Sequence, residues 1–137
     1  TTQPFEVIGA PWLNPFAFAD ELNGRQLPGV WFRPLYFIPY TSKHTGVRCG
    51  GVQAHISDRD ALNAFDVGLH MLCAAKTASP EFQWKNDPLT YSIDWLAGTD
   101  ELRLAIDKGA TPEDLKRTWA PDLAAFVHRR SGYLLYS

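Results

Sequence analysis

The sequence predicts an α+β domain with a small, mostly antiparallel sheet covered by four or five helices. Two stretches rich in β-branched and aromatic residues, 30–38 and 51–56, predict the central strands. Elsewhere, apolar residues recur at helical spacing after capping residues. Because 137 residues suit one compact core, we expect residues 1–137 to form a single domain.

The N-terminal segment predicts a short strand followed by a helix. Residues 4–9 alternate enough for a strand, which residues 9–12 interrupt with Gly and Pro. Asn14 followed by Pro15 predicts a helix start, since Asn caps free N–H groups and Pro suits the first helical position. We expect this helix to end near Asn23.

The two central strands differ in their patterns. Pro34 cannot donate to a ladder, so the first strand is predicted at a sheet edge, or with a bulge that re-aims Arg33. The second strand alternates cleanly, with Val52, Ala54 and Ile56 on one face and Gln53, His55 and Ser57 on the other. Antiparallel sheets can leave one face open, and we expect Arg33, Gln53 and His55 to converge there.

A long core helix is predicted to start from the cap Ser57-Asp58. Its expected core stripe is Leu62, Phe65, Leu69 and Leu72. Gly68 inside this helix suggests a close approach to a neighbouring backbone. His70 lies off the stripe and is predicted at the surface or boundary.

The C-terminal third predicts short elements and one long helix. Residues 81–84 suggest a strand, 85–88 a loop, 92–96 a helical turn and 99–109 a short helix. Thr111 opens a capping box for the last helix, whose predicted stripe is Leu115, Trp119, Leu123 and Phe126, with a kink at Pro121. Residues 133–136 are too apolar to stay exposed, so we expect them to dock.

Composition excludes several function classes. A net charge of −2 gives no excess of cations for a phosphate backbone, so nucleic acid is not a predicted partner. No apolar run approaches the roughly 18 residues of a membrane span. Glycine-rich phosphate loops and nucleophile elbows are missing, so no cofactor is predicted.

The two cysteines give little support for a disulfide, metal or thiol site. Cys73 lies in an apolar string typical of a buried free thiol, whereas Cys49 opens a Gly-Gly turn and is ambiguous. A metal site from His44, Cys49 and His55 has no fixed geometry, and no spacing rule supports a Cys49 nucleophile. No metal is predicted.

The residue types in this sequence indicate ligand binding more clearly than catalysis. Trp12, Trp31 and Tyr40 offer flat faces to a ring, although one of Trp31 and Phe32 must be buried. The predicted substrate-binding residues are Trp12, Arg33, Tyr40, Lys43, Gln53 and His55, a set that fits a carbohydrate bearing an acid group. No residue is assigned as catalytic with certainty.

Glu6 and His55 are the catalytic candidates. Glu6 is either a solvated strand carboxylate or a group aimed at a ligand beside Trp12. A lone histidine in a strand is more often structural, but Gln53 and His55 share a face near Lys43, which favours a site. Glycoside hydrolysis needs two carboxylates, and this chain offers at most one of them.

Four segments together resemble the C-terminal part of the NamZ family, formerly a domain of unknown function. They are residues 1–12 (TTQPFEVIGAPW), 27–34 (LPGV and FRP), 49–59 (CGGVQAHISDR) and 133–136 (YLLY). The family's proteins are bacterial exo-β-N-acetylmuramidases of peptidoglycan recycling. Glu6, Arg33, Gln53 and His55 match polar positions of the family, whereas residues 39–43 (PYTSK) keep only the Lys of a Thr-Phe-Ser-Lys-like stretch.

The resemblance implies a two-part glycoside hydrolase. An N-terminal Rossmann-like domain would carry the main catalytic carboxylate, and an auxiliary domain like this chain would complete the cleft for N-acetylmuramic acid (MurNAc). It implies a peptidoglycan fragment and that N-terminal domain as partners, and a secreted or periplasmic parent. The alternative is a non-catalytic protein-interaction module that binds through an open sheet edge and exposed aromatics.

Overall fold

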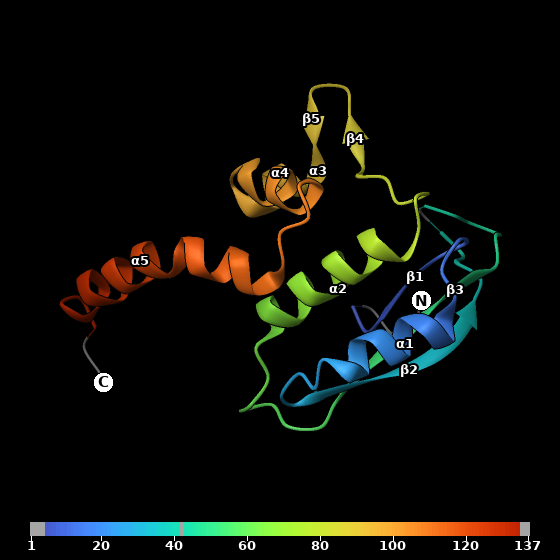
Figure 1. Cartoon of the computed structure of the whole chain (residues 1–137), viewed down its shortest axis with the longest axis horizontal. Coiled ribbons are helices and arrows are strands. Elements are labelled where there is room, and N and C mark those ends of the chain that lie inside the picture. The colour runs from blue at the N-terminus through green and yellow to red at the C-terminus, as the bar shows by residue number, and fades with distance from the viewer. Residues whose placement is uncertain (1–4, 42, 135–137) are drawn as a thin grey trace. The chain divides into compact units, whose positions relative to one another are not determined.

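The computed structural model describes residues 5–41 and 43–134, and the chain divides into two compact units, Thr1–Gln83 and Trp84–Ser137 (Figure 1). The described residues form five helices and five strands. The predicted α+β class, with a small antiparallel sheet, is therefore confirmed.

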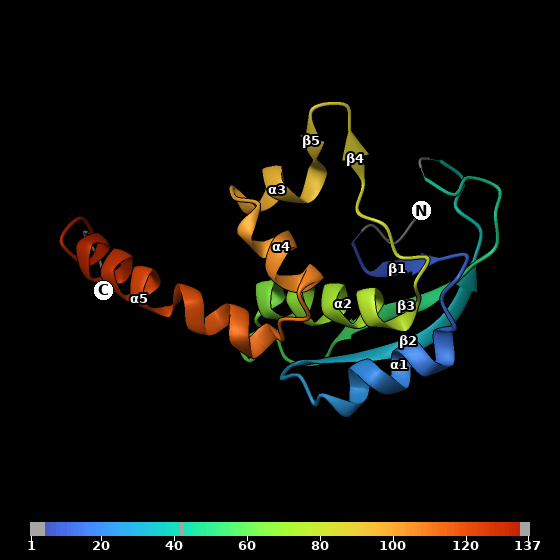
Figure 2. The ribbon, with the colours of Figure 1, turned by 45° about the horizontal axis from the view of Figure 1, so that its top comes forward.

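The first unit contains a three-stranded antiparallel sheet in the order β1-β3-β2. Its elements are β1 (Val7–Ala10), α1 (Pro15–Gly24), β2 (Val30–Phe37), β3 (Cys49–Ile56) and α2 (Ala64–Ala78). Figure 2 shows α1 running along β2 and β3, in agreement with the packing of α1 on both strands. Pro4, where the first strand was predicted to start, lies outside the described residues.

The strand β2 lies at an edge, as predicted, but it has no bulge. Its pairing with β3 runs without interruption from Val30 opposite Ile56 to Phe37 opposite Cys49. Both backbone groups of Phe32 bond to the side chain of Asn23 on α1, at 2.8 and 2.9 Å, so they point away from β3. Because backbone direction alternates along an antiparallel pair, Pro34 also turns its nitrogen to the outer edge, where no donor is needed.

The two faces of this sheet have different roles. One face joins the core of the first unit together with α1 and α2, through Ile8, Ala10, Phe32, Val52, Phe18, Leu22, Val67 and Ala74. The opposite face carries Val7, Trp31, Arg33, Gln53 and His55, by the alternation of side chains along paired strands. We call this second surface the open face.

The helix α2 begins later than predicted. Asn63, not Ser57-Asp58, is its cap and accepts from the backbone N–H of Asp66 at 3.1 Å, while Asp58 caps a separate turn. Two residues of α2 also differ from the prediction in their burial. Phe65 is 63% exposed, and His70, predicted at the surface, is 6% exposed.

The glycines show where backbones approach closely. A Cβ on Gly51 would lie 2.1 Å from the Ile8 carbonyl oxygen, so β1 and β3 need glycine at their contact. Gly68 behaves differently from the prediction, since nothing lies within 4 Å of a Cβ placed there. Its place in α2 therefore has no packing explanation in the described residues.

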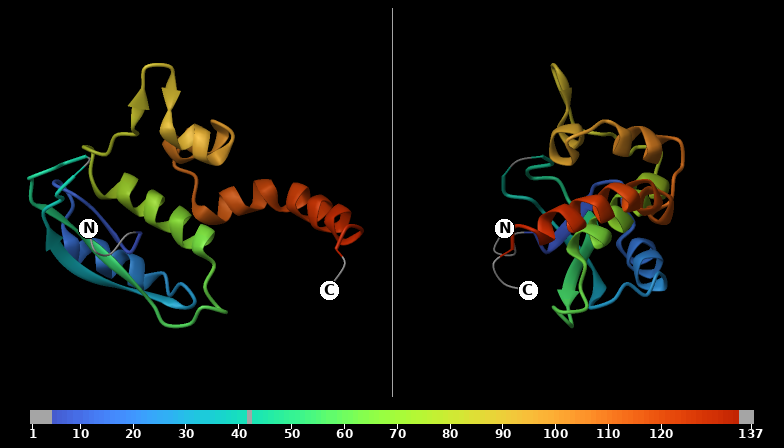
Figure 3. Two further views of the ribbon diagram at one scale, coloured as in Figure 1. Left: turned by 180° about the vertical axis from the view of Figure 1, so that it is seen from behind. Right: turned by 90° about the vertical axis from the view of Figure 1, so that its left-hand side faces the viewer.

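The second unit contains β4 (Asn86–Asp87), β5 (Thr90–Tyr91), α3 (Ser92–Ala97), α4 (Glu101–Asp107) and α5 (Pro112–Ser131) (Figure 3). The strand predicted at residues 81–84 is wrong, because these residues have no strand assignment. The pairing instead joins Asn86–Asp87, from the segment predicted as a loop, to Thr90–Tyr91. Arg103 on α4 forms a bidentate pair with Asp94 on α3, with distances of 2.9 to 3.1 Å. This ion pair joins the two short helices.

The last helix has the predicted capping box. Thr111 accepts from the Asp114 N–H at 3.1 Å, and Asp114 accepts from the Thr111 N–H at 3.0 Å. The predicted docking of residues 133–136 is wrong for its described part, since Tyr133 is 82% and Leu134 50% exposed, while residues 135 and 136 lie outside the described residues. Among the helices of residues 5–41 and 43–134, none is long and apolar enough to cross a membrane.

Candidate functional site

A chain of hydrogen bonds crosses the open face of the first unit. Arg33 Nη2 on β2 donates to Gln53 Oε1 on β3 at 2.6 Å, and Gln53 Nε2 donates to Glu6 Oε2 at 3.2 Å. The sheet register brings them together, because Arg33 lies opposite Gln53, and Glu6 directly precedes β1, which pairs with the other side of β3. Three of the predicted site residues therefore form one connected group, which we call the Glu6–Gln53–Arg33 chain.

The middle of this chain is buried and its ends are exposed. Gln53 is 5% exposed and uses both ends of its amide, so the network fixes the orientation of the side chain. Glu6 and Arg33 are solvent-exposed. Within the described residues, the other guanidinium N–H groups of Arg33 have no acceptor. The open face thus presents an oriented cation and a carboxylate on either side of a rigid amide.

Trp31 and His55 form an aromatic stack on the same face. They lie opposite each other in the register, with ring centroids 4.4 Å apart and planes 14° apart. Trp31 is 47% exposed whereas Phe32 is 1% exposed, which confirms that one of this pair is buried. His55 Nε2 is buried and has no hydrogen-bond partner among the described residues. In this geometry the imidazole supports Trp31 and does not offer Nε2 to a ligand.

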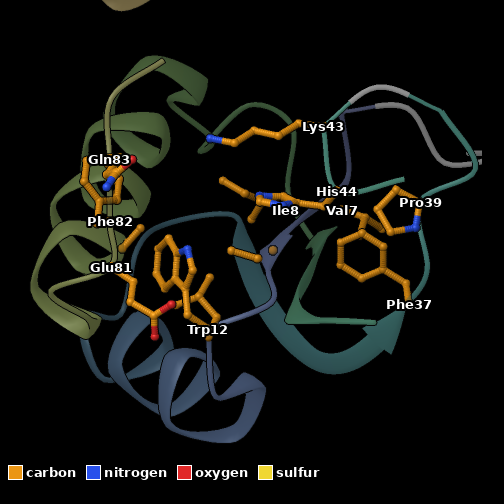
Figure 4. Close-up of a pocket in the computed structure, with 14 residues that line it drawn as sticks. Val7, Ile8, Trp12, Phe37, Pro39, Lys43, His44, Glu81, Phe82 and Gln83 are labelled. Atoms are coloured by element: carbon orange, nitrogen blue, oxygen red, sulfur yellow. The ribbon is translucent and has the colours of Figure 1, made fainter. Parts of the chain in front are cut away.

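A cavity of about 640 Å³ lies beside β1 in the first unit (Figure 4). Trp12 and Phe82 line it and contact each other edge to face, with centroids 6.1 Å apart. Lys43 and His44, from the loop after β2, also line it. The cavity therefore combines an aromatic wall with cationic and polar side chains.

The predicted site residues thus fall into two groups. Glu6, Arg33, Gln53 and His55 lie on the open face, whereas Trp12 and Lys43 line the cavity. Val7 connects the two places, since it lines the cavity and lies opposite Gln53 in the register. Tyr40 is 88% exposed and belongs to neither group.

Sequence reasoning left out residues at both places, among them Trp31 on the open face and Glu81 and Phe82 at the cavity. Trp31 was weighed as a flat face but left out of the predicted set, although its two-residue spacing from Arg33 places both on one strand face. Glu81 and Phe82 reach the cavity from the segment after α2. No local pattern relates that segment to β1, so only the tertiary fold identifies them.

The described residues give little support for a reactive cysteine or a metal site. Cys49 and Cys73 are free and buried. Burial raises the pKa of the Cys49 thiol, which favours the protonated and less nucleophilic form. Among the described residues, no group of three or more His, Cys, Asp or Glu side chains is placed to hold a metal ion.

Comparison with known families decides the family of this chain. The family described as "Exo-beta-N-acetylmuramidase NamZ, C-terminal" matches residues 1–136. The chain belongs to this family.

Two proteins similar to this chain are considerably longer than it. The chain is 38% identical over 137 residues to the peptidoglycan β-N-acetylmuramidase NamZ of Bacillus subtilis (strain 168), covering 99% of this chain and 32% of the relative. A crystal structure of a DUF1343 family protein from Bacteroides fragilis matches 98% of this chain and 36% of its own chain, with a TM-score of 0.83 and 26% identity. The 137 residues therefore span about a third of the length of each relative.

Proposed function

We propose that residues 1–137 act together as the C-terminal auxiliary part of a longer exo-β-N-acetylmuramidase, a glycoside hydrolase that releases terminal MurNAc from peptidoglycan fragments. A Rossmann-like N-terminal part of the parent would carry the main catalytic carboxylate, and this chain would complete the substrate cleft. Membership of the NamZ C-terminal family and the name of the Bacillus subtilis relative support this proposal. A role in cell-wall recycling and a secreted or periplasmic parent belong to the same proposal.

The Glu6–Gln53–Arg33 chain carries the proposal for substrate binding. MurNAc differs from N-acetylglucosamine (GlcNAc) by a lactyl carboxylate, and the unused guanidinium N–H groups of Arg33 suit a bidentate grip on such a group. Gln53 holds Arg33 in place, since its amide is buried and bonded at both ends. The exposed ring of Trp31 gives an adjacent flat surface for the sugar.

The remaining predicted residues take secondary roles in this proposal. Glu6 would accept from a sugar hydroxyl or act as the second carboxylate of the hydrolysis, in which water adds to the anomeric carbon and the leaving oxygen gains a proton. His55 would act by supporting Trp31. Lys43 and Trp12 would bind a part of the glycan that extends into the cavity beside β1.

Kinetics of the full-length parent test the assignment of Arg33. We expect Arg33→Ala to lower kcat/KM for a MurNAc-terminated chromogenic substrate at least tenfold, mainly through KM, since about 1.4 kcal/mol of binding corresponds to tenfold. Arg33→Lys should recover only part of this loss, because Lys lacks the planar fork. Arg59→Ala, which removes an exposed arginine of the turn after β3, is the control. Unchanged kinetics in both Arg33→Ala and His55→Ala would contradict the proposed site.

The rival function is a protein-interaction module without a sugar site. The exposed apolar side chains of α5 favour a contact with another protein surface. The same kinetics separate the two, since a pure interaction module predicts no selective loss of MurNAc-terminated substrate in the Arg33 variants.

A further inference from the structure

The cavity beside β1 continues the open face of the sheet. Val7 lines the cavity and lies opposite Gln53 in the register (Figure 4). Phe37 lines it too, and it shares one face of β2 with Arg33. Neighbouring strands lie about 4.8 Å apart, so Val7 and Arg33 are about 10 Å apart across the sheet. A ligand held at Arg33 can therefore place its adjoining group in the cavity, whose described lining belongs entirely to the first unit.

The free edge of β1 gives this cavity backbone hydrogen-bonding groups. Among the described residues, β1 is an outer strand in the order β1-β3-β2. The Ala54 N–H donates to the Glu6 carbonyl oxygen at 2.8 Å, so the even-numbered residues of this segment direct their backbone groups to β3. Val7 and Gly9 therefore turn their N–H and C=O groups to the outer edge, and both residues line the cavity. These groups are neutral donors and acceptors.

The lining side chains suit a ligand without net charge. With histidine counted as neutral, the charged lining residues are Lys43 and Glu81, whose formal charges cancel. Trp12 and Phe82 form an apolar wall through their edge-to-face contact, and both pack partly against the core. An aromatic wall beside neutral donors and acceptors is the combination that suits the ring face and the amide of an acetamido sugar.

We propose that the cavity binds the sugar that is linked to the terminal MurNAc, namely GlcNAc or another neutral 2-acetamido sugar. Its ring would lie against Trp12. Its acetamido group would accept from the Gly9 N–H or donate to the Val7 carbonyl oxygen, so the free edge of β1 would recognise the amide. This inference rests on the proposed function, because the second sugar is placed relative to a MurNAc held at Arg33.

Saturation-transfer NMR on the full-length parent tests the inference without turnover. The probes are methyl β-N-acetylglucosaminide and methyl β-glucoside, which lacks the acetamido group. We expect the acetamido methyl protons of the first sugar to receive the strongest saturation, and Trp12→Leu to lower this signal at least threefold. Leu removes the flat face but keeps an apolar side chain against the core, which protects the fold better than Ala.

The matched control is Trp95→Leu, at a tryptophan that is 77% exposed and does not line the cavity. This variant should keep the full signal of the acetamido sugar. Equal signals from the two sugars, no signal from the acetamido sugar, or an equal loss in both variants would each overturn the inference.

Kinetics then relate the cavity to the reaction. The substrates are the disaccharide MurNAc-β-1,4-GlcNAc and the chromogenic aryl glycoside of MurNAc, which has no second sugar. We expect Trp12→Leu to lower kcat/KM at least fivefold more for the disaccharide than for the aryl glycoside, whereas Arg33→Ala should lower both to a similar degree. Equal losses of the two substrates in Trp12→Leu would overturn the inference. A parent that binds the acetamido sugar but turns over neither substrate would contradict the proposed function alone.

Discussion

At the scale of single residues, the hydrogen bonds of Gln53 hold the Glu6–Gln53–Arg33 chain in order on the open face. Replacing it by Leu keeps the volume but removes both bonds of the Glu6–Gln53–Arg33 chain. Since Glu6 and Arg33 are exposed and can be hydrated, we expect the free energy of unfolding to fall by only about 1 kcal/mol.

The same Gln53→Leu change should weaken binding much more than stability. We expect the affinity of the parent for MurNAc-terminated fragments to fall at least tenfold, because Arg33 is no longer held in one orientation. Calorimetric titration together with urea unfolding measures both quantities. Gln26→Leu, at an exposed glutamine after α1, is the control. Equal losses in the two variants would contradict the role given to Gln53.

Replacement by Ala is expected to change the free energy of unfolding in opposite directions at two glycines. Gly51→Ala would place a Cβ 2.1 Å from the Ile8 carbonyl oxygen, a backbone atom that cannot move without separating β1 from β3. We expect a loss of about 1–3 kcal/mol in the free energy of unfolding. Gly68→Ala, in the interior of α2 with nothing within 4 Å, should gain about 0.5–1 kcal/mol. Chemical denaturation of both variants checks the signs, and a destabilised Gly68→Ala would indicate a close neighbour that the structure does not show.

At the scale of elements, the capping box of α5 predicts a pH-dependent stability. The hydrogen bond from the Thr111 hydroxyl to Asp114 lowers the pKa of that carboxyl, and the Thr111 N–H and Arg117 act in the same direction. A carboxyl with a lowered pKa stabilises the folded state above its unfolded pKa of about 3.9, and this contribution is lost as the pH falls through the folded pKa.

Thr111→Ala should therefore lower the free energy of unfolding and also change how that free energy depends on pH. We expect a loss of about 1 kcal/mol at pH 7 from the missing cap. The difference between variant and wild type should shrink as the pH falls below the unfolded pKa of about 3.9 and on through the lowered pKa of folded Asp114, because the carboxylate that Thr111 stabilises is progressively protonated. Thermal unfolding at pH 7 and at several acid pH values measures this, and a difference independent of pH would contradict the assignment.

The sequence predicted elements well where a local signal fixes them. Asn14 with Pro15 and Thr111 with Asp114 are side-chain caps, and both helices start at those caps. The start of α2 was wrong because two capping segments, at Asp58 and Asn63, compete within six residues. In the structure Asn63 caps α2, and Asp58 caps the separate turn before it.

At the scale of the whole molecule, the site was only partly predictable. The period of two in β2 and β3 was sufficient to place Arg33, Gln53 and His55 on one face. The link from Gln53 to Glu6 depends on β1 pairing with β3, which connects residues 47 positions apart. Trp12 and Lys43 lie apart from the open face, in a cavity that the segment after α2 also lines, and the sequence has no local signal for that tertiary arrangement.

The central claim is that the open face binds the sugar through Arg33. A crystal structure of the full-length parent with bound MurNAc tests it most directly, through the distance between the Arg33 guanidinium and the lactyl carboxylate. The account predicts a bidentate contact at about 2.7–2.9 Å, with the sugar ring beside Trp31. A sugar bound elsewhere in the parent, without any contact to Arg33, Gln53 or Glu6, would contradict it.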